Sequence, residues 1–156
     1  METSNENRNW EIVSEIELTY KTTVKASERP LITSSQSAYK LIIQSWDSNK
    51  IEFIEQFKIL LLNNSNKVLG ICEISSGGIT GTVVDLRILF SAALKANATA
   101  LIMIHNHPSG KLQASEADKA MTQKVKAAGK LLDIEILDHL IITPKNYYSF
   151  ADDGAL

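Results

Sequence analysis

The sequence has little of several features that would assign a function directly. Its one cysteine, Cys72, excludes an intramolecular disulfide, and we expect it to be a buried thiol of a cytoplasmic protein. No apolar run reaches the roughly 18 residues that a membrane-spanning helix needs. Residues 1–7 are polar, so no signal peptide is expected. Membrane proteins and disulfide-stapled secreted proteins are therefore disfavoured.

An excess of positive charge is lacking too. Sixteen Lys and Arg stand against 18 Asp and Glu, which gives a net charge of −2, and no arginine-rich stretch occurs. Such a chain has no basic field that would hold a phosphate backbone, so we do not expect nucleic acid as a partner.

What is present suits a folded domain. The chain has 156 residues, 44% hydrophobic and 22% charged, which is enough to build a core. We expect residues 1–9 to be disordered and residues 10–156 to form one domain. The alternation of strand-like and helix-like stretches favours an α/β fold. Strands are expected at residues 11–20, 56–62, 67–74, 100–104 and 133–143, and helices through residues 39–46 (capped by Ser35 or Ser37), 84–97 and 115–130.

The most informative stretch is His105-Asn106-His107-Pro108-Ser109-Gly110, followed by Ser115 and Asp118. Residues 100–104 form an apolar strand, and side chains two apart on a strand share a face, so His105 and His107 can point to one place. Asn106 and Pro108–Gly110 then break the strand. Two imidazoles and a carboxylate are the donors of a zinc site that leaves one position open for water.

A plainer interpretation competes with this one. Ser115-Glu116-Ala117-Asp118 also fits a helix capping box, and a His-x-His pair is often only a hydrogen-bonded surface pair. The two interpretations are compatible, since a helix start could hold Asp118 steady. With only three histidines in the chain, two of them at a strand end, the spacing favours a metal site.

The same residues resemble the JAMM motif of the MPN (JAB) metalloprotease superfamily. Together with Asp138-His139 and residues 149–154, the HNHPSG wording resembles the RadC branch, over residues 50–156. The resemblance implies a three-layer α/β fold related to cytidine deaminases, with a mixed sheet flanked by helices. It also implies one zinc ion per chain, with His105, His107 and Asp118 as ligands and Ser115 as a donor to the oxyanion.

In this family an upstream glutamate serves as general acid and base. Glu55 stands just before the strand at 56–62 and matches the family's Glu-x-Phe pattern. Glu52 is the alternative, and Glu73 on the next strand fits less well. The plainer alternative is that Glu55 is a solvated residue at a strand edge, as most glutamates in such positions are.

Asp138-His139 lies within an expected strand. It could orient a metal ligand, but a hydrogen-bonded structural histidine is the interpretation that we favour. Tyr147, Tyr148 and Phe150 are expected to be packing residues.

The implied activity is zinc-dependent hydrolysis of a peptide or isopeptide amide. Two alternatives remain: a binding or scaffold module that retains the metal, and a DNA-repair-associated RadC-type protein. The region before residue 50 is too short and strand-like for the helix-hairpin-helix portion common in RadC-like chains. Iron or nickel would also suit the donors. Residues 75–81 and 111–114 would form the loops that select the substrate, and an exposed sheet edge would allow a homodimer.

Overall fold

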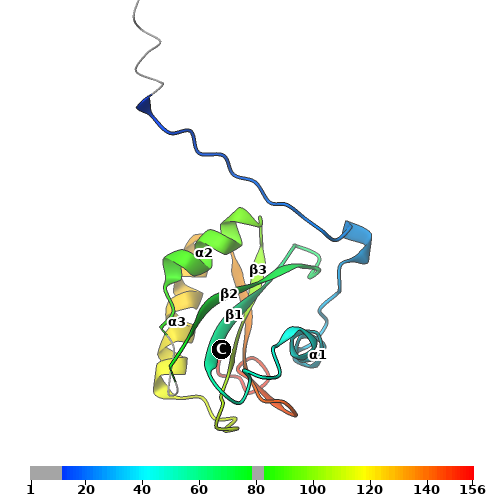
Figure 1. Cartoon of the computed structure of the whole chain (residues 1–156), viewed down its shortest axis with the longest axis vertical. Helices are drawn as coiled ribbons and strands as arrows, with labels where there is room; N and C mark the ends of the chain where they lie inside the picture. Colours follow the sequence, from blue (N-terminus) through cyan, green and yellow to red (C-terminus); the bar gives the residue numbers. More distant parts are fainter. Residues whose placement is uncertain (1–11, 79–82) are drawn as a thin grey trace, which may run out of the picture.

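The computed structural model describes residues 12–78 and 83–156, which form a mixed β-sheet with helices on both faces (Figure 1). This is the α/β architecture that the sequence predicts. In chain order the elements are η3 (Ala26–Glu28), α1 (Ser35–Ser45), β1 (Glu55–Leu62), β2 (Val68–Gly77), α2 (Leu86–Lys95), β3 (Ala100–Asn106), α3 (Glu116–Leu131), β4 (Glu135–Ile142) and β5 (Tyr147–Ser149).

The topology of the sheet brings three chain segments to one end. The strand order is β2-β1-β3-β4-β5. β1 runs antiparallel to both β2 and β3, whereas β3 and β4 are parallel and are joined by α3. Parallel neighbours need such a crossover. The start of β1, the end of β3 and the start of α3 therefore lie at the same end of the sheet.

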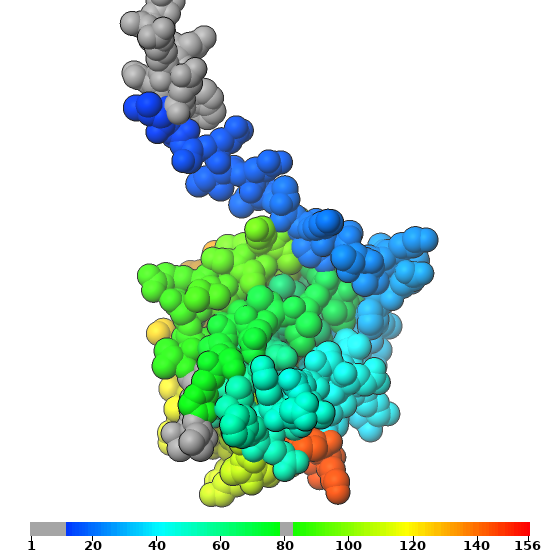
Figure 2. Space-filling model, viewed as in Figure 1, coloured from blue at the N-terminus to red at the C-terminus, as the bar shows by residue number. Residues whose placement is uncertain are grey.

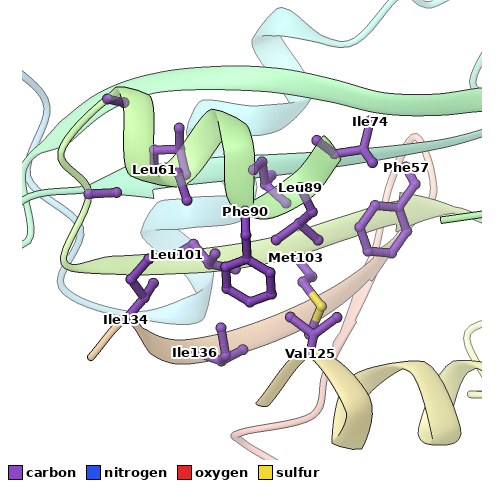
Figure 3. Close-up of a cluster of buried hydrophobic side chains, with 14 residues drawn as sticks. Phe57, Leu61, Ile74, Leu89, Phe90, Leu101, Met103, Val125, Ile134 and Ile136 are labelled. Atoms are coloured by element: carbon purple, nitrogen blue, oxygen red, sulfur yellow. The ribbon is translucent and has the colours of Figure 1, made fainter. Parts of the chain in front are cut away.

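The core has two layers, one on each face of the sheet. On β1, Ile59 and Leu61 point to the layer under α2 and α3, and Leu60 and Leu62 point to the layer under α1. Figure 3 shows the first layer, in which side chains of α2 and α3 meet those of β3. Because residues 59–62 of β1 and 100–104 of β3 are buried on both faces, these stretches are continuous apolar runs.

The expected elements from residue 39 onward are confirmed, with ends shifted by up to four residues. The cap expected for the first helix is wrong. Ser34, not Ser35 or Ser37, is the N-cap, and its side chain accepts a hydrogen bond from the backbone N–H of Ser37. Three serines stand close together here, and only the backbone conformation decides which of them precedes the first turn.

The strand expected at residues 11–20 is also wrong. Residues 14–23 form no strand, and Figure 2 shows this segment standing away from the body of the molecule. Ile16 and Leu18 are more than three-quarters exposed. Alternating apolar residues form a strand only where a neighbouring strand pairs with their backbone and buries their side chains. Here the Tyr20 hydroxyl donates to the Leu69 carbonyl oxygen of β2, but Ile16 and Leu18 stay exposed. Residues 1–9, expected to be disordered, lie outside the described residues, as do residues 79–81 of one expected loop.

Two other expectations concern burial. Cys72 is half-buried rather than fully buried, and burial, followed by the charge of Glu73, raises the pKa of its thiol. Tyr147 packs on Tyr39, with ring centroids 4.8 Å apart, and Phe150 is fully buried. In the part of the chain that the structure describes, the helices are all too short or too polar to cross a membrane.

Candidate metal centre

Four side chains meet where β1 begins, β3 ends and α3 begins. The donor atoms of Glu55, His105, His107 and Asp118 all lie within 4.8 Å of one another. Antiparallel pairing of Phe57 with His105 carries Glu55 to the histidines, since Glu55 is two residues before Phe57 on the same face. The structure thus brings together the three residues that the sequence proposed as ligands and the glutamate that it proposed beside them.

The other two glutamates lie elsewhere. Glu52 is exposed in the loop before β1. Glu73 lies on β2, where its carboxylate accepts a hydrogen bond of 2.6 Å from the Gln56 side chain. Among the described residues, Glu55 is the glutamate that joins the histidine cluster.

The spacing of the donor atoms fits a small metal ion. His105 Nε2 is 2.9 Å from His107 Nε2 and 3.2 Å from Asp118 Oδ1, and His107 Nε2 is 3.4 Å from Asp118 Oδ2. In a tetrahedral zinc site with bonds of about 2.0–2.2 Å, neighbouring donor atoms are about 3.3 Å apart. The three residues fit a zinc ion with a fourth position open.

The protonation of the His107 ring also suits metal binding. Its Nδ1 lies 2.7 Å from the carbonyl oxygen of Lys111. A carbonyl oxygen can only accept, so the neutral ring carries its hydrogen on Nδ1 and keeps a lone pair on Nε2. A backbone contact four residues away therefore aims the donor nitrogen at the cluster.

Ser115 and Asp118 form the capping box that the sequence offered as the plainer interpretation. Ser115 Oγ accepts from the Asp118 N–H at 3.0 Å, and the Ser115 N–H donates to Asp118 Oδ2 at 2.8 Å. The carboxylate also faces both histidines. The two carboxylate oxygens of Asp118 therefore serve both the helix start and the cluster, and the two interpretations describe the same geometry.

The electrostatics of the cluster favour an ionised carboxylate. Burial opposes ionisation of Asp118, but the two imidazoles that face its carboxylate outweigh burial and hold the pKa of Asp118 well below its ordinary value. The hydrogen bond to Asp118 raises the pKa of His107 in turn. Protons and a metal ion would therefore compete for His107.

His139 lies directly behind His105. Its Nε2 is 2.8 Å from His105 Nδ1, its Nδ1 is 2.6 Å from Thr122 Oγ1, and the ring stacks on Phe150. Burial holds the pKa of His139 well below its ordinary value. The histidine is both structural, as we favoured, and in contact with a proposed ligand.

Asp138 does not share that contact. Its carboxylate accepts from Ser149 Oγ at 2.6 Å and from the Ala151 N–H at 3.0 Å, so it holds the turn that follows β5. Within the pair that the sequence singled out, only His139 reaches a proposed ligand.

Asn106 has a role that sequence reasoning missed. It ends β3 rather than opening a loop, and it is fully buried. Its Oδ1 accepts from the Gln56 N–H at 2.7 Å, and its Nδ2 donates to the carbonyl oxygens of Ile51 and Ile54 at 2.7 and 2.8 Å. Asn106 thus fixes the chain on both sides of Glu55. An amide between two histidines was the available signal, but its partners lie 50 to 55 residues away in the chain.

Fold and site together define a class: a JAB-type domain, in which a mixed sheet and one helix start present a glutamate, two histidines and an aspartate. The chain belongs to the RadC-like JAB domain family, which matches residues 32–155.

Three relatives carry the name UPF0758 protein, which states no activity. One from Flavobacterium johnsoniae is 57% identical over 100 residues, 64% of this chain and 44% of the relative. One from Porphyromonas gingivalis is 40% identical over 129 residues, 82% of this chain and 56% of the relative. One from Symbiobacterium thermophilum is 40% identical over 103 residues, 66% and 44% of the two chains. The chain thus spans about half the length of these curated relatives.

Proposed function

We propose that this chain is a zinc-dependent hydrolase that cleaves amide bonds in peptides or proteins. The observation that carries the proposal is the meeting of Glu55 with His105, His107 and Asp118, whose donor atoms lie within 4.8 Å of one another. Three of these residues have the chemistry and spacing of zinc ligands. The fourth is a carboxylate beside them, in reach of the position that a tetrahedral ion leaves open.

A zinc ion held there would act as a Lewis acid and bring the pKa of water at its open position to about 7. The role of Glu55 is to accept a proton from the attacking water and to deliver it to the nitrogen of the departing amine. Glu55 is half-buried, and the hydrogen bonds of Asn106 on both sides of it hold its backbone in place. A fixed carboxylate loses little entropy when it meets the water.

The role of Ser115 is to stabilise the oxyanion. As helix cap its oxygen accepts the Asp118 N–H, and this leaves the hydroxyl hydrogen available to a substrate. Removal of one donor of this kind costs about 2.7–4 kcal/mol in other hydrolases. Ser115 is exposed, as a residue that meets substrate must be.

A cleft lined in part by Pro108, the residue that follows His107, supports the proposal of a peptide-like substrate. The cleft measures about 260 Å³. Its lining combines the loop after β3, the turn after β4 and one acidic side chain, namely Pro108, Ser109, Gly110, Thr143, Pro144, Lys145 and Glu52. The backbone of the segments that follow β3 and β4 is a surface on which an extended peptide can form hydrogen bonds.

The test combines metal analysis with hydrolysis of a mixture of fluorescence-quenched peptides. We expect about one zinc per chain in the wild type, in Glu55→Ala and in the control Glu28→Ala, an exposed glutamate that belongs to neither the cluster nor the cleft, and little in His107→Ala. Hydrolysis should fall about 10²–10⁴-fold in Glu55→Ala, because a general base is lost, and should persist in Glu28→Ala. Wild-type protein that takes up no metal after reconstitution with zinc would contradict the proposal. If iron or nickel is found instead, the zinc assignment is wrong but the site stands.

A further inference from the structure

A line of hydrogen bonds runs from the donor cluster into the core and back to the helix that carries Asp118. His105 Nδ1 faces His139 Nε2 at 2.8 Å, and His139 Nδ1 faces Thr122 Oγ1 at 2.6 Å. Thr122 Oγ1 in turn lies 2.7 Å from the carbonyl oxygen of Asp118. His139 and Thr122 are fully buried, so no water intervenes to alter the pattern.

The position of each hydrogen in this line follows from its last member. The Asp118 carbonyl has no hydrogen, so the Thr122 hydroxyl must donate to it. A hydroxyl has one hydrogen, so toward His139 the Thr122 oxygen can only accept, and the hydrogen lies on His139 Nδ1. Burial between aromatic rings keeps His139 neutral, so its Nε2 has a lone pair and accepts.

The His105 ring therefore donates from Nδ1 and keeps the lone pair on Nε2, the atom that faces His107 and Asp118. The reverse direction would leave two oxygens, those of Thr122 and the Asp118 carbonyl, in contact at 2.7 Å inside the core with no hydrogen between them. The chosen direction leaves bare only the Nε2 atoms of His105 and His107, 2.9 Å apart, and that is the contact that a metal ion would fill. The reverse direction would also put a hydrogen on His105 Nε2, which is the form that an unconstrained neutral histidine prefers. A nitrogen that carries a hydrogen cannot bind a metal.

We propose that Thr122, acting through His139, sets the tautomer of His105 in which Nε2 can bind a metal ion. Thr122 and His139 are then positioning residues of the metal centre. The inference rests on the proposed function, because it concerns the same site. It goes beyond that function by assigning control of one ligand to a threonine on α3, four residues from another ligand.

The two histidines of the centre are thus set by different devices. His107 donates from Nδ1 directly to a backbone carbonyl, that of Lys111, which has no alternative but to accept. His105 donates to a histidine, which could either donate or accept, so a further residue is needed to fix the direction. Thr122 supplies that constraint because its own hydrogen is committed to the Asp118 carbonyl.

The test uses Thr122→Val, which keeps the shape of the side chain without the hydroxyl, and Thr122→Ser, which keeps the hydroxyl. Thr143→Val is the matched control, because Thr143 is a buried threonine whose hydroxyl bonds only to its own turn. Long-range ¹H–¹⁵N NMR of the metal-free proteins at pH 8 reports which ring nitrogen carries the hydrogen. Competition with a chromophoric chelator gives the zinc affinity.

We expect the wild type, Thr122→Ser and Thr143→Val to show hydrogen on Nδ1 of His105 and equal zinc affinity. Thr122→Val should shift His105 toward the Nε2–H form and bind zinc about 10–100-fold more weakly, the loss typical when a residue behind a ligand is removed. An unchanged tautomer in Thr122→Val would overturn the inference, as would equal losses of affinity in Thr122→Val and Thr143→Val. A wild type that binds no zinc would contradict the proposed function instead, and the tautomers of the metal-free proteins would still decide the role of Thr122.

Discussion

The two halves of the metal centre are built in opposite ways. In the strand half, on β1 and β3, His105 is 1% exposed and is held by a residue 34 positions away. In the loop half, which leads into α3, the His107 and Asp118 side chains are 16% and 14% exposed. The backbone groups that hold these two side chains by hydrogen bonds belong to Lys111 and Ser115, which lie three or four residues away. One half is held by the core, the other by local turns.

This difference indicates that the two halves of the metal centre have different roles. The strand half cannot shift without disturbing the sheet, so it can supply a fixed geometry for Glu55 and His105. The loop half is anchored by contacts that cost little to break and reform, so it can adjust when an ion or a substrate arrives. Substitutions in the two halves should therefore separate protein stability from metal affinity.

The largest effect on stability is expected for Asn106→Ala. The change would leave the buried Gln56 N–H and two carbonyls without partners, and we expect a loss of about 3 kcal/mol in the free energy of unfolding. Urea unfolding measures it, with Asn64→Ala at an exposed turn as the control that should stay within about 0.5 kcal/mol. Equal losses for the two variants would contradict the role of Asn106 as a clamp.

His105→Ala and His107→Ala should sharpen the contrast. Both should bind zinc more than about 100-fold more weakly, because each removes a proposed ligand. Only His105→Ala should also destabilise the metal-free fold, by about 2 kcal/mol, since it leaves a cavity beside Phe57 and an unpaired nitrogen on His139. Thermal unfolding in the presence of a chelator tests this. If the two variants unfold at the same temperature, the two halves are not held differently.

Ser115 offers a smaller effect that separates capping from catalysis. Ser115→Ala should cost about 1 kcal/mol of stability, whereas Ser115→Gly, which is tolerated as an N-cap, should cost a few tenths. Both lack the hydroxyl, so both should lose hydrolysis to the same extent, about 10²–10³-fold. If hydrolysis instead falls more in Ser115→Ala than in Ser115→Gly, in parallel with the loss of stability, Ser115 acts only as a cap.

The smallest effect is the pH dependence of the metal-free protein. The pKa of Asp118 is lowered on folding, so its contribution is present above about pH 4 and is lost as the pH falls. The pKa of His107 is raised, so its contribution is present below about pH 6.5 and is lost as the pH rises through the folded value. The pair should therefore stabilise most between about pH 4 and 6.5, by less than about 1 kcal/mol.

The measurement for this pH dependence is the difference in unfolding free energy between wild type and Asp118→Asn across the pH range. The wild-type curve alone is insufficient, because the lowered pKa of His139 works in the opposite direction: it removes stability as the pH falls below about 6.5. A difference that stays flat from pH 4 to pH 8 would contradict the coupling of Asp118 and His107.

Much of the fold followed from the sequence because its elements carry strong local patterns. The apolar runs of β1 and β3 and the helical spacing of α2 and α3 predicted their positions to within a few residues. The failure at residues 11–20 has the opposite cause. Their apolar residues alternate as in a strand, but a strand forms only beside a partner strand. The sequence of this segment does not indicate whether such a partner lies near it.

The site divides along the same line. By itself the sequence determined the loop half, because the His-x-His pair, the Ser115 cap and Asp118 are neighbours in the chain and their geometry is that of one strand end and one helix start. The family resemblance favoured Glu55 over Glu52, but only the tertiary structure decided that Glu55 meets the histidines, and that His139 and Thr122 stand behind His105. Those contacts depend on sheet register and helix crossover, and both are set by packing between segments far apart in the chain.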